Sequence, residues 1–156
     1  MEKDYQVVGF RIGNETYGVR IGSVREIVRV PEITIVPNAP EAIEGVINLR
    51  GKVVPVIDLR LKFGLAAAEY TQRTCIIVTQ VQAESGAVLM GIVVDGVSEV
   101  LTLSGSEIED TPDFGEEYSG GYLLGMAKVK GKVKILLDIE RVLSTQDLHN
   151  LNSMLS

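Results

Sequence analysis

The chain offers few side chains whose type and spacing could perform catalysis. It has one histidine, His149, and one cysteine, Cys75. It contains no CxxC, HExxH or P-loop motif, and no GxGxxG follows a strand pattern. His149 falls in a segment of helical periodicity and Cys75 begins an apolar run, so we interpret them as a helix-surface residue and a buried structural thiol. The sequence predicts no catalytic residue, no enzymatic activity and no cofactor.

Carboxylates gather between residues 104 and 119, and carboxylates are the ligands of calcium sites. The segment contains Glu107, Glu109, Asp110, Asp113, Glu116 and Glu117. An EF-hand loop alternates its ligands around a central glycine, and this segment lacks that spacing. We therefore interpret it as a solvated surface loop and predict no metal site.

The sequence contains a long internal repeat. Residues 45–63 (GVINLRGKVVPVIDLRLKF) align without gaps with residues 125–143 (GMAKVKGKVKILLDIERVL), and residues 17–30 resemble residues 90–103. The period is too long for a solenoid, so we predict two copies of a compact β unit, with repeat blocks at about 10–63 and 81–143. Asp58 aligns with Asp138, and we predict that both cap the start of a helix.

Short β-branched runs separated by glycine turns predict the elements that carry these residues. Expected strands are 5–12, 16–21, 46–49, 52–57, 75–81, 88–94, 97–103, 122–129 and 132–137, with a short helical turn before a strand in 22–30 and a C-terminal helix after 138. Pro55 indicates an edge strand or a bulge. The pattern predicts a mainly β fold of two small barrels. Because neither copy is large enough to bury a generous core alone, we expect a shared core and a binding groove between the lobes.

Composition narrows the function further. The chain has 156 residues, 46% of them hydrophobic, which fits one globular domain of two lobes. Its formal net charge of −6 disfavours a nucleic-acid partner and a polybasic membrane anchor. A single cysteine leaves no intrachain disulfide, no apolar run reaches transmembrane length, and the N-terminus lacks a signal peptide. We therefore expect a cytoplasmic protein with no direct membrane insertion.

The first copy of the repeat resembles a known signature. Residues 45–60 (GVINLRGKVVPVIDLR) closely resemble the signature of CheW-type chemotaxis coupling proteins. The upstream VREI at 24–27, the prolines before the hairpin, and VVDGVSEV at 93–100 also resemble that family. The resemblance covers nearly the whole chain.

This resemblance implies both a fold and a role. The fold would be two intertwined SH3-like five-stranded β-barrels sharing a core, with short helices and a C-terminal helix, in a single CheW-like domain over residues 1–156. Exchange of strands between the lobes is compatible with it. The role would be that of a non-enzymatic scaffold in two-component chemotaxis signalling. Its partners would be the regulatory domain of the histidine kinase CheA and the cytoplasmic tips of chemoreceptors (methyl-accepting chemotaxis proteins), which would hold it at membrane receptor arrays.

The family pattern also implies partner-binding residues. Arg50 and Glu26 occupy positions linked with partner binding, although an exposed turn residue and a solvated strand face are the ordinary interpretations. Lys130 replaces Arg50 in the second copy and lacks its planar fork, so we predict that the two lobes bind differently. Apolar candidates to line the groove are Val28, Val30, Ile33 and Val100.

Three alternatives remain open at this stage. One is a CheW-like regulatory domain cut from a larger kinase or from a coupling–receiver protein, although the chain itself leaves no room for a kinase or receiver domain. Another is a small-barrel RNA-associated protein, which the acidic balance and 5% aromatic content disfavour. The last is an enzyme without a recognisable acid–base or metal constellation.

Overall fold

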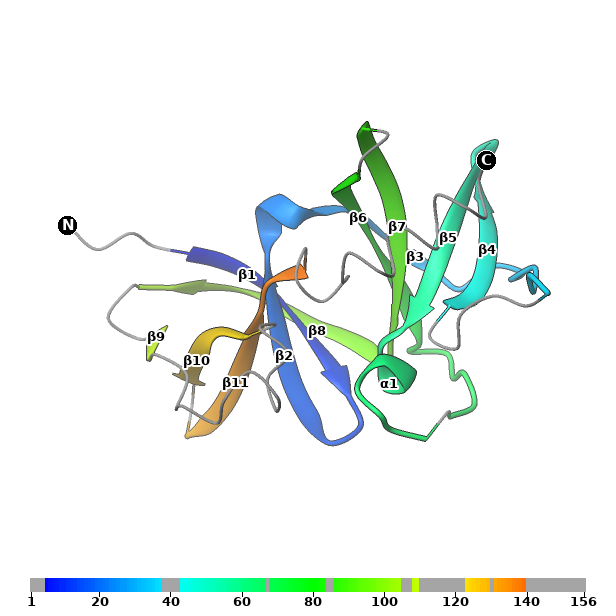
Figure 1. The fold of residues 1–156 in the computed structure, drawn as a ribbon. Coiled ribbons are helices and arrows are strands. Elements are labelled where there is room, and N and C mark those ends of the chain that lie inside the picture. The colour runs from blue at the N-terminus through cyan, green and yellow to red at the C-terminus, as the bar shows by residue number, and fades with distance from the viewer. Residues whose placement is uncertain are drawn as a thin grey trace.

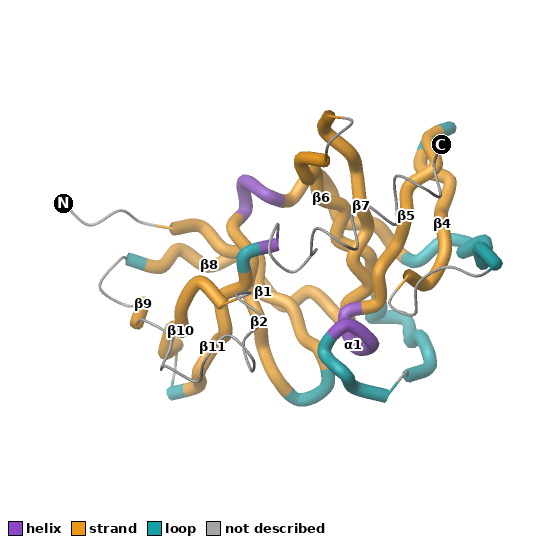
Figure 2. The backbone as a smooth tube through the Cα atoms, in the orientation of Figure 1, coloured by secondary structure: helices purple, strands orange, loops and turns teal. Residues whose placement is uncertain are grey.

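Strands make up most of the described backbone (Figures 1 and 2). The structure is a computed structural model that describes residues 5–37, 43–66, 68–83, 86–104, 108–109, 123–129 and 131–139. Its strands are β1 Tyr5–Ile12, β2 Glu15–Arg20, β3 Val24–Arg29, β4 Ile43–Leu49, β5 Lys52–Asp58, β6 Cys75–Ala83, β7 Gly86–Val94, β8 Gly96–Leu103, β9 Ile108–Glu109, β10 Leu123–Val129 and β11 Lys132–Leu137. Its helices are the 3₁₀ turn η1 Ile21–Ser23 and α1 Leu59–Lys62. The predicted mainly β fold and the short turn before β3 are confirmed.

The strands form two sheets, and each sheet mixes the two copies of the repeat. Sheet A has the order β8-β1-β2-β11-β10-β9, and sheet B has the order β3-β6-β7-β5-β4. By the sequence alignment, β2, β3, β4 and β5 correspond to β7, β8, β10 and β11. The first strands of each copy therefore pair with the last strands of the other. Sheet A lies on the left of Figure 1, sheet B on the right, and α1 between them at the bottom.

The repeat is reproduced residue by residue in the strand registers. In sheet B, β5 runs parallel to β7 with Val56 opposite Gly91. In sheet A, β11 runs parallel to β2 with Leu136 opposite Gly18. Val56 aligns with Leu136 and Gly91 aligns with Gly18, so the two parallel junctions are equivalent. The pairing also makes β1 the counterpart of β6, a relationship that the sequence alignment did not show.

A shared core joins the two sheets. Its largest cluster of buried side chains draws Phe10 and Ile12 from sheet A and Ile77 and Ile92 from sheet B, with Leu59 of α1 between them. A second cluster lies within sheet B and a third within sheet A. The predicted shared core is therefore confirmed, and α1 is part of it.

Two local predictions have different outcomes. The carboxylate of Asp58 accepts a hydrogen bond from the backbone N–H of Arg60 at 2.9 Å, which confirms it as the N-cap of α1. Of the two alternatives predicted for Pro55, the edge position is wrong, because β5 lies inside sheet B between β7 and β4. A bulge does occur close by, since the register of β4 and β5 shifts between Ile43 and Gly45. Parallel pairing with β7 begins only at Val56, so the missing N–H of Pro55 interrupts no bond on that side. The C-terminal helix beyond Ile139, most of the acidic segment, and His149 lie outside the described residues.

Candidate functional site

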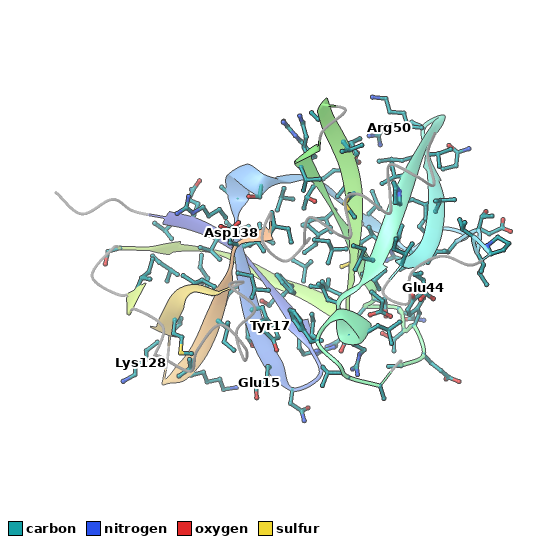
Figure 3. The ribbon with its side chains drawn as sticks, viewed as in Figure 1. Glu15, Tyr17, Glu44, Arg50, Lys128 and Asp138 are labelled. Atoms are coloured by element: carbon teal, nitrogen blue, oxygen red, sulfur yellow. The ribbon has the colours of Figure 1, made fainter. Side chains whose placement is uncertain are left out.

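The candidate site is built around the turn between β4 and β5. Arg50 has φ 50° and Gly51 has φ 89°, as in the primed turns that match the twist of a two-stranded hairpin. The side chain of Asn48 accepts a hydrogen bond from the backbone N–H of Gly51 at 2.8 Å and so holds the turn. Figure 3 shows Arg50 at the free end of this hairpin, at the opposite end of sheet B from α1.

Arg50 binds Glu26 of β3 through both ends of its guanidinium group. Its Nη1 donates to Glu26 Oε2 at 3.0 Å, and its Nη2 donates to Oε1. Such a two-bond fork needs the planar geometry that arginine supplies and lysine lacks. The two residues that the sequence singled out are therefore in direct contact.

This ion pair is open to solvent. The Arg50 side chain is 70% exposed and the Glu26 side chain is 30% exposed. The hydrogen bond from Arg50 is the main reason why the pKa of Glu26 lies below its ordinary value, and the same bond raises the pKa of Arg50. Exposed pairs of this kind add little to folding stability, so the arrangement is better suited to presenting fixed charges to a partner.

Sheet A carries a second ion pair at a related place. Glu99 of β8 aligns with Glu26, and its carboxylate lies 3.5 Å from the amine of Lys134 on β11. Lys134 aligns with Val54 rather than with Arg50, and it is largely buried. The two copies therefore pair equivalent glutamates with different cations, one exposed and one buried. Lys130, the aligned partner of Arg50, lies outside the described residues.

Three of the predicted apolar residues lie together and one lies apart. Val28, Val30 and Ile33 are half-buried and pack on the apolar cluster of sheet B. Val100 lies on β8, an edge strand of sheet A, and is 56% exposed. These residues thus belong to two surfaces on different sheets, and their role in partner binding stays a prediction.

Other exposed apolar residues were not singled out from the sequence. On sheet B, Ile27 is 42% and Val53 61% exposed; Ile35, in the segment after β3, is 78% exposed; and on sheet A, Val133 is 46% exposed. Ile27 aligns with Val100, and Val53 aligns with Val133, so the exposed positions recur in both copies. Comparing the outward positions of the two repeat copies would have identified them, because side chains alternate between the faces of a strand.

The described residues show no candidate metal site, and their one cysteine is not activated. They contain no cluster of three or more His, Cys, Asp or Glu side chains that could hold a metal ion. Cys75 is buried, and burial raises the pKa of its thiol, which disfavours the reactive thiolate. Over the same residues, no helix has the length and apolarity needed to cross a membrane.

Comparison with known proteins agrees with this picture of a binding module. The family model described as a CheW-like domain matches residues 6–147. The chemotaxis protein CheW of Klebsiella aerogenes is 41% identical over 139 residues, covering 89% of this chain and 81% of that protein. The chemotaxis protein CheW of Rhizobium meliloti is 35% identical over 142 residues, covering 91% and 89%. The crystal structure of the scaffolding protein TtCheW from Thermoanaerobacter tengcongensis superposes with a TM-score of 0.81 at 32% identity, covering 93% of this chain and 96% of that one.

Proposed function

We propose that this chain, which belongs to the CheW-like domain family, couples chemoreceptor tips to the regulatory domain of a CheA-type histidine kinase. At the coarser level it is a chemotaxis scaffold, as the names of its relatives and of its structural neighbour support. In the proposed role it performs no chemical step. It would be held at membrane receptor arrays through its partners.

The observation that carries the proposal is the exposed pair of Arg50 and Glu26 at the end of sheet B. The pair fixes both side chains before any partner arrives, so binding would lose less side-chain freedom. Exposed apolar side chains on the same sheet offer contact area, notably Ile27, the neighbour of Glu26 in β3, and Val53 of β5. A fixed charge pair beside exposed apolar residues is typical of an interface that selects its partner by charge complementarity.

Calorimetric titration tests both proposed partners separately. The wild-type chain would be titrated with the isolated regulatory domain of the kinase and with a helical-hairpin fragment of a receptor tip. Arg50→Glu should weaken at least one of the two affinities at least tenfold, because it places two carboxylates side by side. Lys128→Glu is the matched control, since Lys128 is an exposed cation on β10 of sheet A.

Two outcomes would contradict the proposal. Absence of binding by the wild-type chain to either partner at high micromolar concentration would rule out the coupling role. Equal binding by the wild-type chain and Arg50→Glu to both partners would remove Arg50 from the interface. In each case circular dichroism would confirm that the variant is folded.

A further inference from the structure

The chain connects the two sheets at two places within the described ranges. It passes from sheet A to sheet B through η1, between β2 and β3, and returns from sheet B to sheet A at Asp95, between β7 and β8. The two crossovers are equivalent in the repeat, where Asp95 aligns with Gly22. They differ in what holds them.

Asp95 binds three residues from two distant parts of the chain. Its Oδ2 accepts hydrogen bonds from the backbone N–H of Gly13 at 2.7 Å and from Nη2 of Arg60 at 2.6 Å. Its Oδ1 accepts from Nε of Arg60 at 3.0 Å, and its own backbone N–H donates to the carbonyl oxygen of Arg11 at 2.9 Å. Arg11 and Gly13 belong to the β1–β2 hairpin of sheet A, whereas Arg60 belongs to α1, which follows β5 of sheet B.

These contacts are partly shielded from water. The side chains of Arg60 and Asp95 are 22% and 21% exposed. They line a crevice of about 470 Å³ together with Asn14, Thr71 and Thr74. Hydrogen bonds to an ionised carboxylate are stronger than bonds between neutral groups, and partial burial limits their screening. The contacts of Asp95 are therefore directional and comparatively strong.

The other crossover has a glycine, Gly22, at the position equivalent to Asp95. Gly22 is exposed, and a methyl group placed on it would meet no heavy atom within 4 Å. The shared core between the sheets consists of apolar side chains, whose contacts are non-directional. A carboxylate thus ties one crossover to its surroundings, whereas Gly22 has no side chain that could do the same at the equivalent position.

We propose that Asp95 is a positioning residue that fixes the angle between sheets A and B. An aspartate at this crossover ties the hairpin of one sheet to the helix that follows the other, and the apolar core alone would permit small rotations. Removing the carboxylate would let the two sheets rotate relative to each other, while the strands within each sheet stay hydrogen-bonded as before. The surfaces that the two sheets present to partners would then lose their fixed relative placement.

Distance measurement between spin labels tests this directly. Labels at Lys52→Cys in sheet B and Lys128→Cys in sheet A, both exposed positions, would report the inter-sheet distance in a Cys75→Ala background. Asp95→Asn leaves one acceptor oxygen for three donors, so we expect the distance distribution to broaden about twofold or to shift. Amide exchange at Gly13 should accelerate at least tenfold.

Two further variants keep the test decisive. Arg60→Lys retains the charge but loses the fork and should broaden the distribution in the same direction, so it replaces Asp95→Asn if that variant does not fold. Glu26→Gln, which breaks an ion pair within sheet B alone, should leave the distribution unchanged. A folded Asp95→Asn or Arg60→Lys variant with the wild-type distribution would overturn the proposal, even if its melting temperature fell.

Discussion

Arg50 and Glu26 bind each other although they belong to opposite edges of sheet B. Glu26 is on β3, the first strand of the sheet order, and Arg50 follows β4, the last. The segment after β3 also lies against β4, because Thr34 and Val46 exchange backbone hydrogen bonds of 2.8 and 2.9 Å. The sheet therefore curves enough to bring its two edge strands together. The ion pair stands where those edges meet.

The conformation of Arg50 leads to a prediction that separates stability from binding. A non-glycine residue at φ 50° is mildly strained, and Asn-Gly is the preferred pair for a primed hairpin turn. Arg50→Asn should raise the melting temperature by about 2 °C while weakening partner binding, because it relieves the strain and removes the fork. Differential scanning calorimetry and partner titration on one preparation would check both effects. A lower melting temperature would contradict the strain argument.

Close packing at the parallel junction predicts a strong effect at one glycine. A methyl group on Gly91 would lie 2.7 Å from Cγ2 of Ile76, well inside contact distance. Gly91→Ala should therefore destabilise the fold by about 2 kcal/mol in urea denaturation. Gly22→Ala, at an exposed position with no neighbour within 4 Å, is the matched control and should be nearly neutral. Equal stability of the two variants would show that β6 and β7 shift apart easily.

Local features were predictable from the sequence, and long-range ones were not. The β4–β5 turn and the cap at Asp58 depend on residues within a few positions of each other, so glycine and aspartate at those positions were sufficient signals. The contact between Glu26 and Arg50 depends on the curvature of sheet B, which no local pattern specifies. Family resemblance indicated both residues, but only the structure shows that they bind each other.

The placement of strands explains the other differences. The alternation of apolar and polar residues along β3 and β8 indicates which side chains point inward, yet it does not say to which sheet each strand belongs. Val28 and Val100 were expected to line one groove between the lobes; the structure places them on different sheets, and their role in the groove stays a prediction. Pro55 was expected at an edge or a bulge because a proline usually breaks a ladder, but β5 is an inner strand that joins β7 only from Val56 onward. Neither fact is visible before the sheet order is known.

Asp58 combines a favourable hydrogen bond with an unfavourable charge. Burial is the main reason why its pKa is raised, and the nearby carboxylates of Glu44 and Asp95 add to the effect, against the opposing influence of Arg60. Asparagine caps a helix about as well as aspartate and carries no charge. Asp58→Asn should therefore match or exceed the wild type in stability at pH 7, whereas Asp58→Ala should lose about 1 kcal/mol. Urea denaturation of both variants would decide, and equal losses would show that the charge itself is needed.

Asp95 should make the opposite contribution to the pH dependence of stability. Its burial raises the pKa, but the hydrogen bonds from Arg60 and Gly13 and the nearby charge of Arg11 outweigh that effect, so the folded-state pKa lies below the ordinary value. The unfolded chain then binds a proton more readily than the folded one. The stability from Asp95 is therefore complete above the unfolded pKa of about 4, and it is lost as the pH falls through the folded pKa.

The difference in unfolding free energy between the wild type and Asp95→Asn should consequently be constant from pH 8 to about 5 and shrink as the pH falls below about 4. Asp58→Asn supplies the control, because a raised folded-state pKa gives the reverse trend: Asp58 becomes less favourable to folding as the pH rises through the interval between its two pKa values. Urea denaturation at several pH values would measure both curves. A difference for Asp95→Asn that stays constant down to pH 2 would mean that the pKa of Asp95 is the same in the folded and the unfolded chain. It would contradict the ion pair with Arg60 as the source of the connection between the sheets.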